Sequence, residues 1–381
     1  ATLGMGVVAC LAYMFIDLEG NEVERGHKAV HNPLKGQATT DGNDRVRAEA
    51  VQALGKIGET AAVVAVPGLV RALSDRDNWV SALAAEALGE MGDLADGAIS
   101  ALVRSLSHPN AEVRRNSAEA LSKMNGAAAA ARPSLEKAAR DEDGGVRSEA
   151  IRALGAIGAP TPTSTQAVLA GLQDLDPQVR AAAIESVGRW GDTSTAVVGT
   201  LLILLDDAND QVKVQATKVL PALAGATPEV IDGLCRRLLE DDSDWVQLYA
   251  ALAPGKLGPA TAASGASLLR AAQTADVSVR EQAMRAIATI QPPETTEALI
   301  GGLKDACGDI RRVASAGWMN ATAISEEAIP ALIEGLRDPE VQVRANCAHA
   351  LARLDVIPAP AIPHLKQTNR QNQEVEFAVI S

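Results

Sequence analysis

Small apolar residues recur along the chain at the three- and four-residue steps of a helix, and the same pattern returns about once per 33 residues. One well-defined apolar face consists of Val146, Ala150, Ile151, Leu154 and Ile157. Asp143 precedes this face at a position where it can cap the first turn, and Gly155 and Gly158 are expected to end the helix. The segment therefore predicts one amphipathic helix per repeat.

A Val or Ile, usually followed by a basic residue, marks the start of each predicted helix. These positions are Val46, Val80, Val113, Val146, Val179, Val212, Val246, Val279, Ile310 and Val343. Successive members are 31 to 34 residues apart, which predicts a regular array from Asn43 onward. One unit is too small to bury its own apolar face, so neighbouring units must stack.

A second helix is predicted in each unit after a short turn. Examples are the groups Pro67, Leu69, Val70 and Leu73 and Pro330, Leu332, Ile333 and Leu336, with proline expected near the first helical turn. Apolar residues make up 47% of the chain but aromatic residues only 2%, which suits closely packed helices. The predicted fold is all-α: an α-solenoid of about ten helix pairs.

The residues of the repeat also carry a family resemblance. The run from Asp143 to Gly158 is echoed in residues 43–58 and, more loosely, 176–191, whereas the ankyrin and tetratricopeptide signatures are absent. It resembles the HEAT repeat, in particular the HEAT-like repeats of the phycobilisome lyase type, over residues 43–381. The resemblance implies binding or scaffolding, with catalysis in a few members.

An acid precedes a base by four residues at the start of several predicted helices. The pairs are Asp143 and Arg147, Asp176 and Arg180, Asp276 and Arg280, and Glu340 and Arg344. The resemblance implies that such residues form a ladder between stacked repeats. Ser81 and Gln247 replace the base in two units, and each of these units has a tryptophan, Trp79 or Trp245, before the valine.

The N-terminal segment differs from the repeats, because residues 3–16 contain no charged side chain. Its candidate membrane residues are Leu3, Met5, Val7, Val8, Leu11, Tyr13, Phe15 and Ile16. A helix of this run is about 21 Å long, which is shorter than the ~30 Å hydrocarbon layer of a membrane. A few more apolar residues upstream would make it long enough, and residues 1–16 are therefore predicted to be part of a membrane anchor. The alternatives are a helix packed on protein and a lipidated Cys10.

Residues 17–42 are predicted to be a linker or extended arm before the solenoid, 43–381. The acidic flank of the apolar run weakly favours an extracytoplasmic (periplasmic) solenoid. At the other end, residues 372–380 resemble the first helix of a further unit.

Catalytic chemistry is not indicated. The chain has a formal charge of −13, which disfavours binding to nucleic acid, and its four cysteines form no CxxC motif. No histidine is followed by Glu, as a HEAT-repeat hydroxylase would require, and His27 and His31 lie in the predicted linker. We therefore expect no catalytic residue, cofactor or metal. Cys347 is expected to be a small core residue.

A possible binding surface lies on the second helices. One register reads Arg71, Arg104, Lys137, Ala170, Ile203, Arg236, Arg270, Gly301 and Glu334, with basic residues on both sides of an apolar middle. This row could be an ordinary solvated face, or it could bind an acidic or mixed peptide with Trp79, Trp245 and Tyr249 as aromatic anchors.

The leading functional hypothesis is a non-catalytic protein scaffold, tethered to the membrane as a subunit of a larger bacterial membrane complex. A lyase or chaperone for a tetrapyrrole such as a phycobilin is the alternative that the resemblance suggests. A soluble peptide-binding adaptor is the third possibility.

Overall fold

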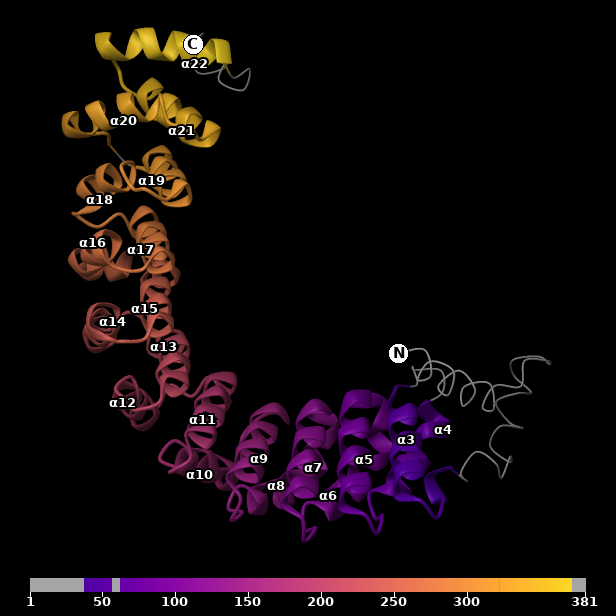
Figure 1. Ribbon diagram of the computed structural model, residues 1–381. Helices are drawn as coiled ribbons and strands as arrows, with labels where there is room; N and C mark the ends of the chain where they lie inside the picture. The colour runs from indigo at the N-terminus through magenta and orange to yellow at the C-terminus, as the bar shows by residue number, and fades with distance from the viewer. Residues whose placement is uncertain (1–37, 57–61, 322, 372–381) are drawn as a thin grey trace, which may run out of the picture. The chain divides into compact units, whose positions relative to one another are not determined.

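The computed structural model describes residues 38–56, 62–321 and 323–371, and every regular element in these ranges is a helix. The helices follow one another in pairs (Figure 1). This confirms the all-helical repeat fold predicted from the sequence.

Each of the ten marker positions lies in the first helix of a pair. These helices are α3 (Asp44–Gly55), α5 (Asn78–Met91), α7 (Ala111–Lys123), α9 (Gly144–Ala156), α11 (Pro177–Trp190), α13 (Asp210–Ala224), α15 (Asp244–Leu257), α17 (Val277–Ile290), α19 (Gly308–Asn320) and α21 (Val341–Ala352). Nine of the ten marker side chains are fully buried. Val46 is 43% exposed, because no described repeat packs against its side of α3.

The second helices are shorter. They are α4 (Ala62–Ala72), α6 (Ile99–Ser105), α8 (Arg132–Ala138), α10 (Pro162–Gly171), α12 (Thr195–Leu204), α14 (Pro228–Glu240), α16 (Gly265–Thr274), α18 (Thr295–Gly302), α20 (Ile329–Gly335) and α22 (Ile362–Gln371). Short 3-10 helices are η2 (Ala38–Thr40), η4 (Gly92–Ala98), η5 (Asn125–Ala131), η6 (Gly258–Ser264), η7 (Glu326–Ala328) and η8 (Ala359–Ala361). Pro330 lies in the first turn of α20 as expected, but Pro67 lies inside α4.

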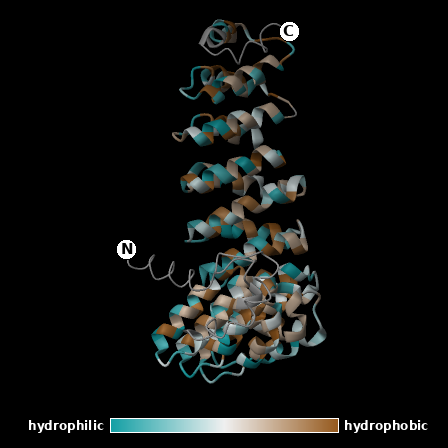
Figure 2. Ribbon diagram, turned by 90° about the vertical axis from the view of Figure 1, so that its right-hand side faces the viewer, coloured by the Kyte–Doolittle hydropathy of each residue, from teal (hydrophilic) through white to brown (hydrophobic). Residues whose placement is uncertain are grey.

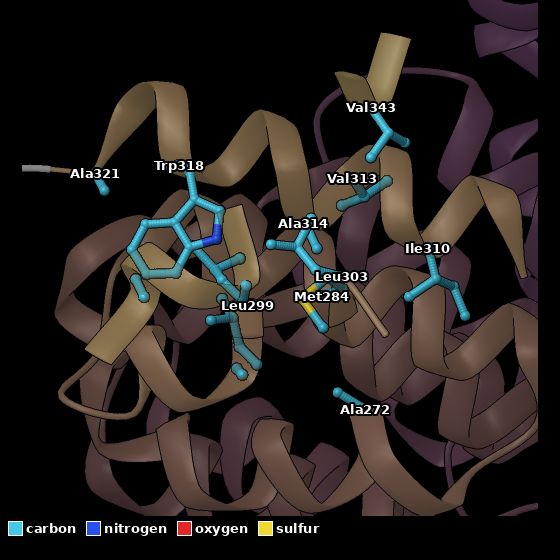
Figure 3. Close-up of a cluster of buried hydrophobic side chains, with 14 of the residues drawn as sticks. Ala272, Met284, Leu299, Leu303, Ile310, Val313, Ala314, Trp318, Ala321 and Val343 are labelled. Carbon is cyan, nitrogen blue, oxygen red and sulfur yellow. The ribbon is translucent and has the colours of Figure 1, made fainter. Parts of the chain in front are cut away.

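The chain forms two compact units, which we call unit 1 (up to Asp192) and unit 2 (from Thr193). Within each unit the first helices stack side by side and the second helices form another layer. Figure 2 shows apolar and polar residues mixed along individual helices, as expected when one face of a helix is buried. In unit 2 the buried Trp318 lies beside Leu299 (Figure 3).

The helix ends agree in part with the sequence. Asp143 caps α9, because its carboxylate accepts a hydrogen bond of 3.0 Å from the backbone N–H of Val146. Gly155, however, does not end α9 but lies within it, where Ser186 of α11 passes too closely for a side chain. Gly158 follows the helix with a positive φ of 98°.

The predictions for residues 1–16, for most of the linker with His27 and His31, and for residues 372–380 lie outside the described residues. Among the residues that the structure does describe, no helix is long and apolar enough to cross a membrane.

Candidate protein-binding surface

A ladder of ion pairs connects successive repeats. Arg147 donates two hydrogen bonds of 2.8 Å from Nε and Nη2 to the carboxylate of Asp174, which lies in the loop after the second helix of the same repeat. Its Nη1 also donates to the carbonyl oxygen of Asp141, at 2.9 Å. The Asp174 carboxylate in turn accepts from the backbone N–H of Asp176. One guanidinium therefore joins two consecutive loops.

The same arrangement recurs in both units. The equivalent pairs are Arg47–Asp75 and Arg114–Asp141 in unit 1, and Lys213–Asp241, Arg280–Asp305 and Arg311–Asp338 in unit 2. The ladder is thus present, but Arg147 does not pair with the acid four residues before it. The carboxylate of Asp143 is used to cap α9, and Arg147 extends to the following loop instead.

The ladder holds its charges firmly. Burial raises the pKa of Asp174, but the hydrogen bonds from Arg147 and Asp176 and the nearby positive charges outweigh it, so the pKa lies below its usual value. The hydrogen bond to Asp174 also raises the pKa of Arg147. Both groups stay ionised near neutral pH, so the ladder is structural and is not suited to proton transfer.

The structure confirms the two predicted gaps in the ladder. In each gap both the base and the carboxylate of the ion pair are replaced. Ser81 and Gln247 donate only to carbonyl oxygens, of Asp75 at 3.2 Å and of Asp241 at 2.7 Å. At the position that supplies the carboxylate elsewhere, the first gap has His108 and the second has Thr274, the last residue of α16. Sequence analysis missed these two residues, although reading about 27 residues beyond each replaced base would have found them.

The tryptophans at the gaps are exposed. Trp79 is 51% and Trp245 is 65% exposed, each in the first turn of its helix. Tyr249 differs, because its side chain is half-buried and Lys218 Nζ lies 4.1 Å from its ring centroid. Tyr249 therefore takes part in a contact between the neighbouring helices α13 and α15.

The basic row in unit 1 is exposed and unpaired. Arg71, Arg104 and Lys137 lie on α4, α6 and α8, and no ion pair joins any of them to a described carboxylate. The only acidic residue on the second helices of unit 1, within the described ranges, is Glu136, which accepts a hydrogen bond of 2.9 Å from Thr161. This surface, which we call the basic row, carries uncompensated positive charge.

Charges on the first helices of unit 1 are mostly paired. Lys123 lies 2.6 Å from Glu90 and 3.1 Å from Glu119. Arg152 pairs with Glu149 and, at 3.4 Å, with Glu185, which also binds Arg189. These pairs compensate charge locally, whereas no described carboxylate forms an ion pair with a base of the basic row.

In unit 2 the same register is mixed. Ile203 is 72% exposed, and Arg236 lies 3.3 Å from Asp206 and 3.6 Å from Asp232. Arg270 is exposed, followed by Gly301 and Glu334. A shallow cavity of about 390 Å³ adjoins Glu334 and is lined by Leu303, Lys304, Ala331, Gly335, Arg337 and Asp338. No single charge dominates this part of the surface.

Within the described ranges, no three His, Cys, Asp or Glu side chains lie close enough to hold a metal ion. Cys347 is fully buried, and burial raises the pKa of its thiol to about 12, so it is the inert core residue that the repeat pattern predicts.

Family comparisons agree with this geometry. A model of HEAT repeats matches residues 31–122, 99–174, 165–254 and 231–319, and a second model, of the single HEAT repeat, matches residues 328–355. The chain belongs to the HEAT repeat family. The match is to HEAT repeats in general, so the phycobilisome lyase subtype stays a prediction.

Solved structures share the HEAT fold at low identity. Importin beta matches with a TM-score of 0.61 and 16% identity, over 93% of this chain and 56% of its own. Kap95, in its complex with Nup1, matches with a TM-score of 0.58 and 15% identity, over 95% and 56% of the two chains. An engineered protein gives a TM-score of 0.52 and 22% identity, over 87% and 98%. The chain thus spans about half the length of importin beta and Kap95. A comparison with curated proteins finds no match.

Proposed function

We propose that this HEAT-repeat protein is a non-catalytic scaffold that binds other proteins through the exposed surface of its repeats. A stack of helix pairs presents a long surface, and the ladder that holds the stack together uses its charged residues for structure. Kap95, which has the same fold, was solved bound to Nup1. A shared fold alone does not establish a shared function, so the proposal rests on the surface itself.

The observation that carries the proposal is the basic row. Arg71, Arg104 and Lys137 recur at one register of three successive second helices, all exposed and without a carboxylate partner in the described structure. Complementary charge guides the encounter between proteins and suppresses wrong partners. An acidic segment of a partner protein is therefore the ligand that this surface fits best.

The proposal extends to the membrane on the sequence of residues 3–16 alone. In this form, the N-terminal segment tethers the scaffold, on the extracytoplasmic side, to other subunits of a bacterial membrane complex. Deleting residues 1–16 tests this part separately: the tether predicts loss of the protein from the membrane fraction, and an unchanged distribution would favour a soluble adaptor.

Quantitative crosslinking in the native cell tests the binding surface. We compare the wild type with the triple variant R71E/R104E/K137E and with a control, R45E/K56E/R115E, which changes the net charge equally at three exposed positions of the first-helix layer. We expect partners to crosslink near α4, α6 and α8 in the wild type and the control but not in the triple variant. Partner binding that survives the triple variant would contradict the proposed surface.

A further inference from the structure

The basic row has a fixed spacing that selects the form of its ligand. Arg71, Arg104 and Lys137 are separated by 33 residues each, one per repeat. The first helices of these repeats pack side by side, which places them roughly 8–10 Å apart, and we take this repeat interval as the spacing of the bases on the second helices. A ligand that meets all three must present acidic groups at the same interval and on one side.

An extended chain meets this condition better than a helix. Exposed large apolar side chains are absent from the described parts of α4, α6, α8 and α10, whereas a bound amphipathic helix needs an apolar groove. A polyproline-type chain has three residues per turn and rises about 3.1 Å per residue, so every third side chain returns to the same side after about 9 Å. A β-strand fits less well, because its side chains return to the same face at every second residue, after only roughly 6.6 Å.

The surface does not suit single-stranded nucleic acid. Proteins that bind such strands combine bases with aromatic side chains on which the nucleotides stack. None of the four second helices of unit 1 contains an aromatic residue, and the whole chain carries a formal charge of −13. The surface thus offers charge for a carboxylate but no platform for a nucleobase.

The geometry points to an extended, polyproline-like segment of a partner protein, with Glu or Asp at every third position, as the ligand of the basic row. This inference rests on the proposed scaffold function and adds its sequence specificity. The fourth position of the register in unit 1 is the exposed Ala170 of α10, so three acidic residues at i, i+3 and i+6 suffice.

Fluorescence anisotropy with the full-length protein at low ionic strength tests the spacing. Three labelled peptides of identical composition have their Glu residues at every second, every third or every seventh position in a Pro/Ser background. We expect the period of three to bind more tightly by roughly two- to tenfold, since each exposed ion pair contributes modestly. The triple variant R71E/R104E/K137E should lose this binding, and the control R45E/K56E/R115E should keep it.

A gain-of-function variant provides an independent measurement. Ala170→Lys adds a base at the next position of the row, so it should tighten binding of a period-three peptide with four Glu residues by about two- to fivefold. It should leave the affinity for three Glu residues unchanged. Circular dichroism checks that all variants remain folded, which is expected because every altered side chain is exposed.

The outcomes separate this inference from the proposed function. Equal binding of all three peptides, or preference for the period of seven, would overturn the extended period-three ligand while leaving an acidic partner in place. Failure of the wild type to bind any acidic peptide would overturn the acidic ligand, and the crosslinking experiment then decides the scaffold function. Tighter binding of a single-stranded oligonucleotide than of the peptides would overturn both in favour of a phosphate backbone.

Discussion

First helices approach one another more closely in unit 1 than in unit 2, and one position nine residues after the marker valine records the difference. In unit 1 this position includes Gly89 and Gly155, where an added Cβ would lie 2.9 Å from Cα of Ala120 and of Ser186, respectively. In unit 2 the equivalent Gly255 has 3.4 Å to Cα of Ala286. The other equivalents in unit 2 are the larger Pro221, Ala288, Met319 and Ala352.

This difference shows that one repeat length can be packed in two ways. Unit 1 has glycine at this position in four of its five first helices, and Gly89 and Gly155 allow close backbone contacts, whereas in unit 2 the glycine is confined to Gly255 and the other four helices have side chains there. The surfaces differ as well, because Arg104 in unit 1 has no carboxylate partner among the described residues while Arg236 in unit 2 has two. The ladder is common to both units.

The largest effect is expected from Asp241→Ala in unit 2. The Asp241 side chain is 1% exposed and binds Lys213 at 2.8 Å and Arg237 at 3.1 Å, so its removal strands two partly buried cations. We expect a loss of about 3 kcal/mol in the free energy of unfolding, compared with about 2 kcal/mol for Asp141→Ala in unit 1. The side chain of Asp141 is 14% exposed and has one close arginine.

Denaturant unfolding combined with amide hydrogen exchange measures both variants, because exchange shows which unit has lost protection. Glu142→Ala, at a side chain 90% exposed, is the control and should cost no more than about 0.5 kcal/mol. If Asp241→Ala proved as mild as this control, the ladder would not be what joins the repeats.

A smaller effect, of opposite sign in the two units, is expected from replacing glycine by alanine. Alanine favours a helix over glycine by about 1 kcal/mol, so Gly255→Ala, which fits at ordinary contact distance, should be neutral or stabilising. At Gly155 the added Cβ would lie 2.5 Å from Ser186 Oγ and 2.9 Å from Cα of the same residue. Because backbone cannot move aside cheaply, Gly155→Ala should destabilise unit 1 by about 1–2 kcal/mol.

Thermal and denaturant midpoints of these two variants compare the packing directly. Destabilisation of similar size at both positions would mean that the first helices are packed equally closely in the two units. A variant Gly155→Ala that also carries Ser186→Gly divides the steric cost, because it removes Oγ and Cβ of Ser186 but leaves its Cα at 2.9 Å, so we expect partial recovery relative to Ser186→Gly alone.

The repeat could be predicted from the sequence, because the same local features occur again in each repeat. The marker valine, the capping Asp143 and the apolar helix face are local features that recur in each unit, and the structure confirms them. The role of Gly155 could not be predicted in this way. A glycine near a helix end and a glycine at a close helix contact look alike in one sequence, and only the position of Ser186 distinguishes them.

The candidate surface was less predictable for the same reason. The exposure of Arg71, Arg104 and Lys137 follows from the helical register, which the repeat fixes. Their lack of ion pairs, and the contact of Arg236 with Asp206, depend on which side chains meet between distant positions, whereas the pair of Arg236 with Asp232 is local to α14. The pairing of Arg147 with Asp174, 27 residues away, is such a contact too, and nearby acids in the sequence concealed it.

The smallest effect concerns pH and tests whether both units share the ladder chemistry. Burial raises the pKa of Asp141 and of Asp305, but hydrogen bonds from Arg114 and Arg280, respectively, with backbone N–H groups and nearby positive charges, leave each pKa below the ordinary 3.8. A carboxyl whose pKa is lowered by folding stabilises the protein above its unfolded pKa. This stabilisation is lost as the pH falls from about 4 through the folded value.

The variants Asp141→Asn and Asp305→Asn should therefore be less stable than the wild type at neutral pH, by about 1 kcal/mol, with the difference shrinking below about pH 4. Urea unfolding at a series of pH values measures it, with Glu142→Gln as the exposed control whose difference should stay small throughout. If the difference in stability persisted unchanged to about pH 2, the Asp side chain would stabilise the protein through packing or hydrogen bonds that Asn cannot make, and not through its charge. Because the ladder geometry is the same in both units while the glycine contacts are not, the two Asn variants should show one common pH dependence even where the Gly155 and Gly255 variants differ in sign.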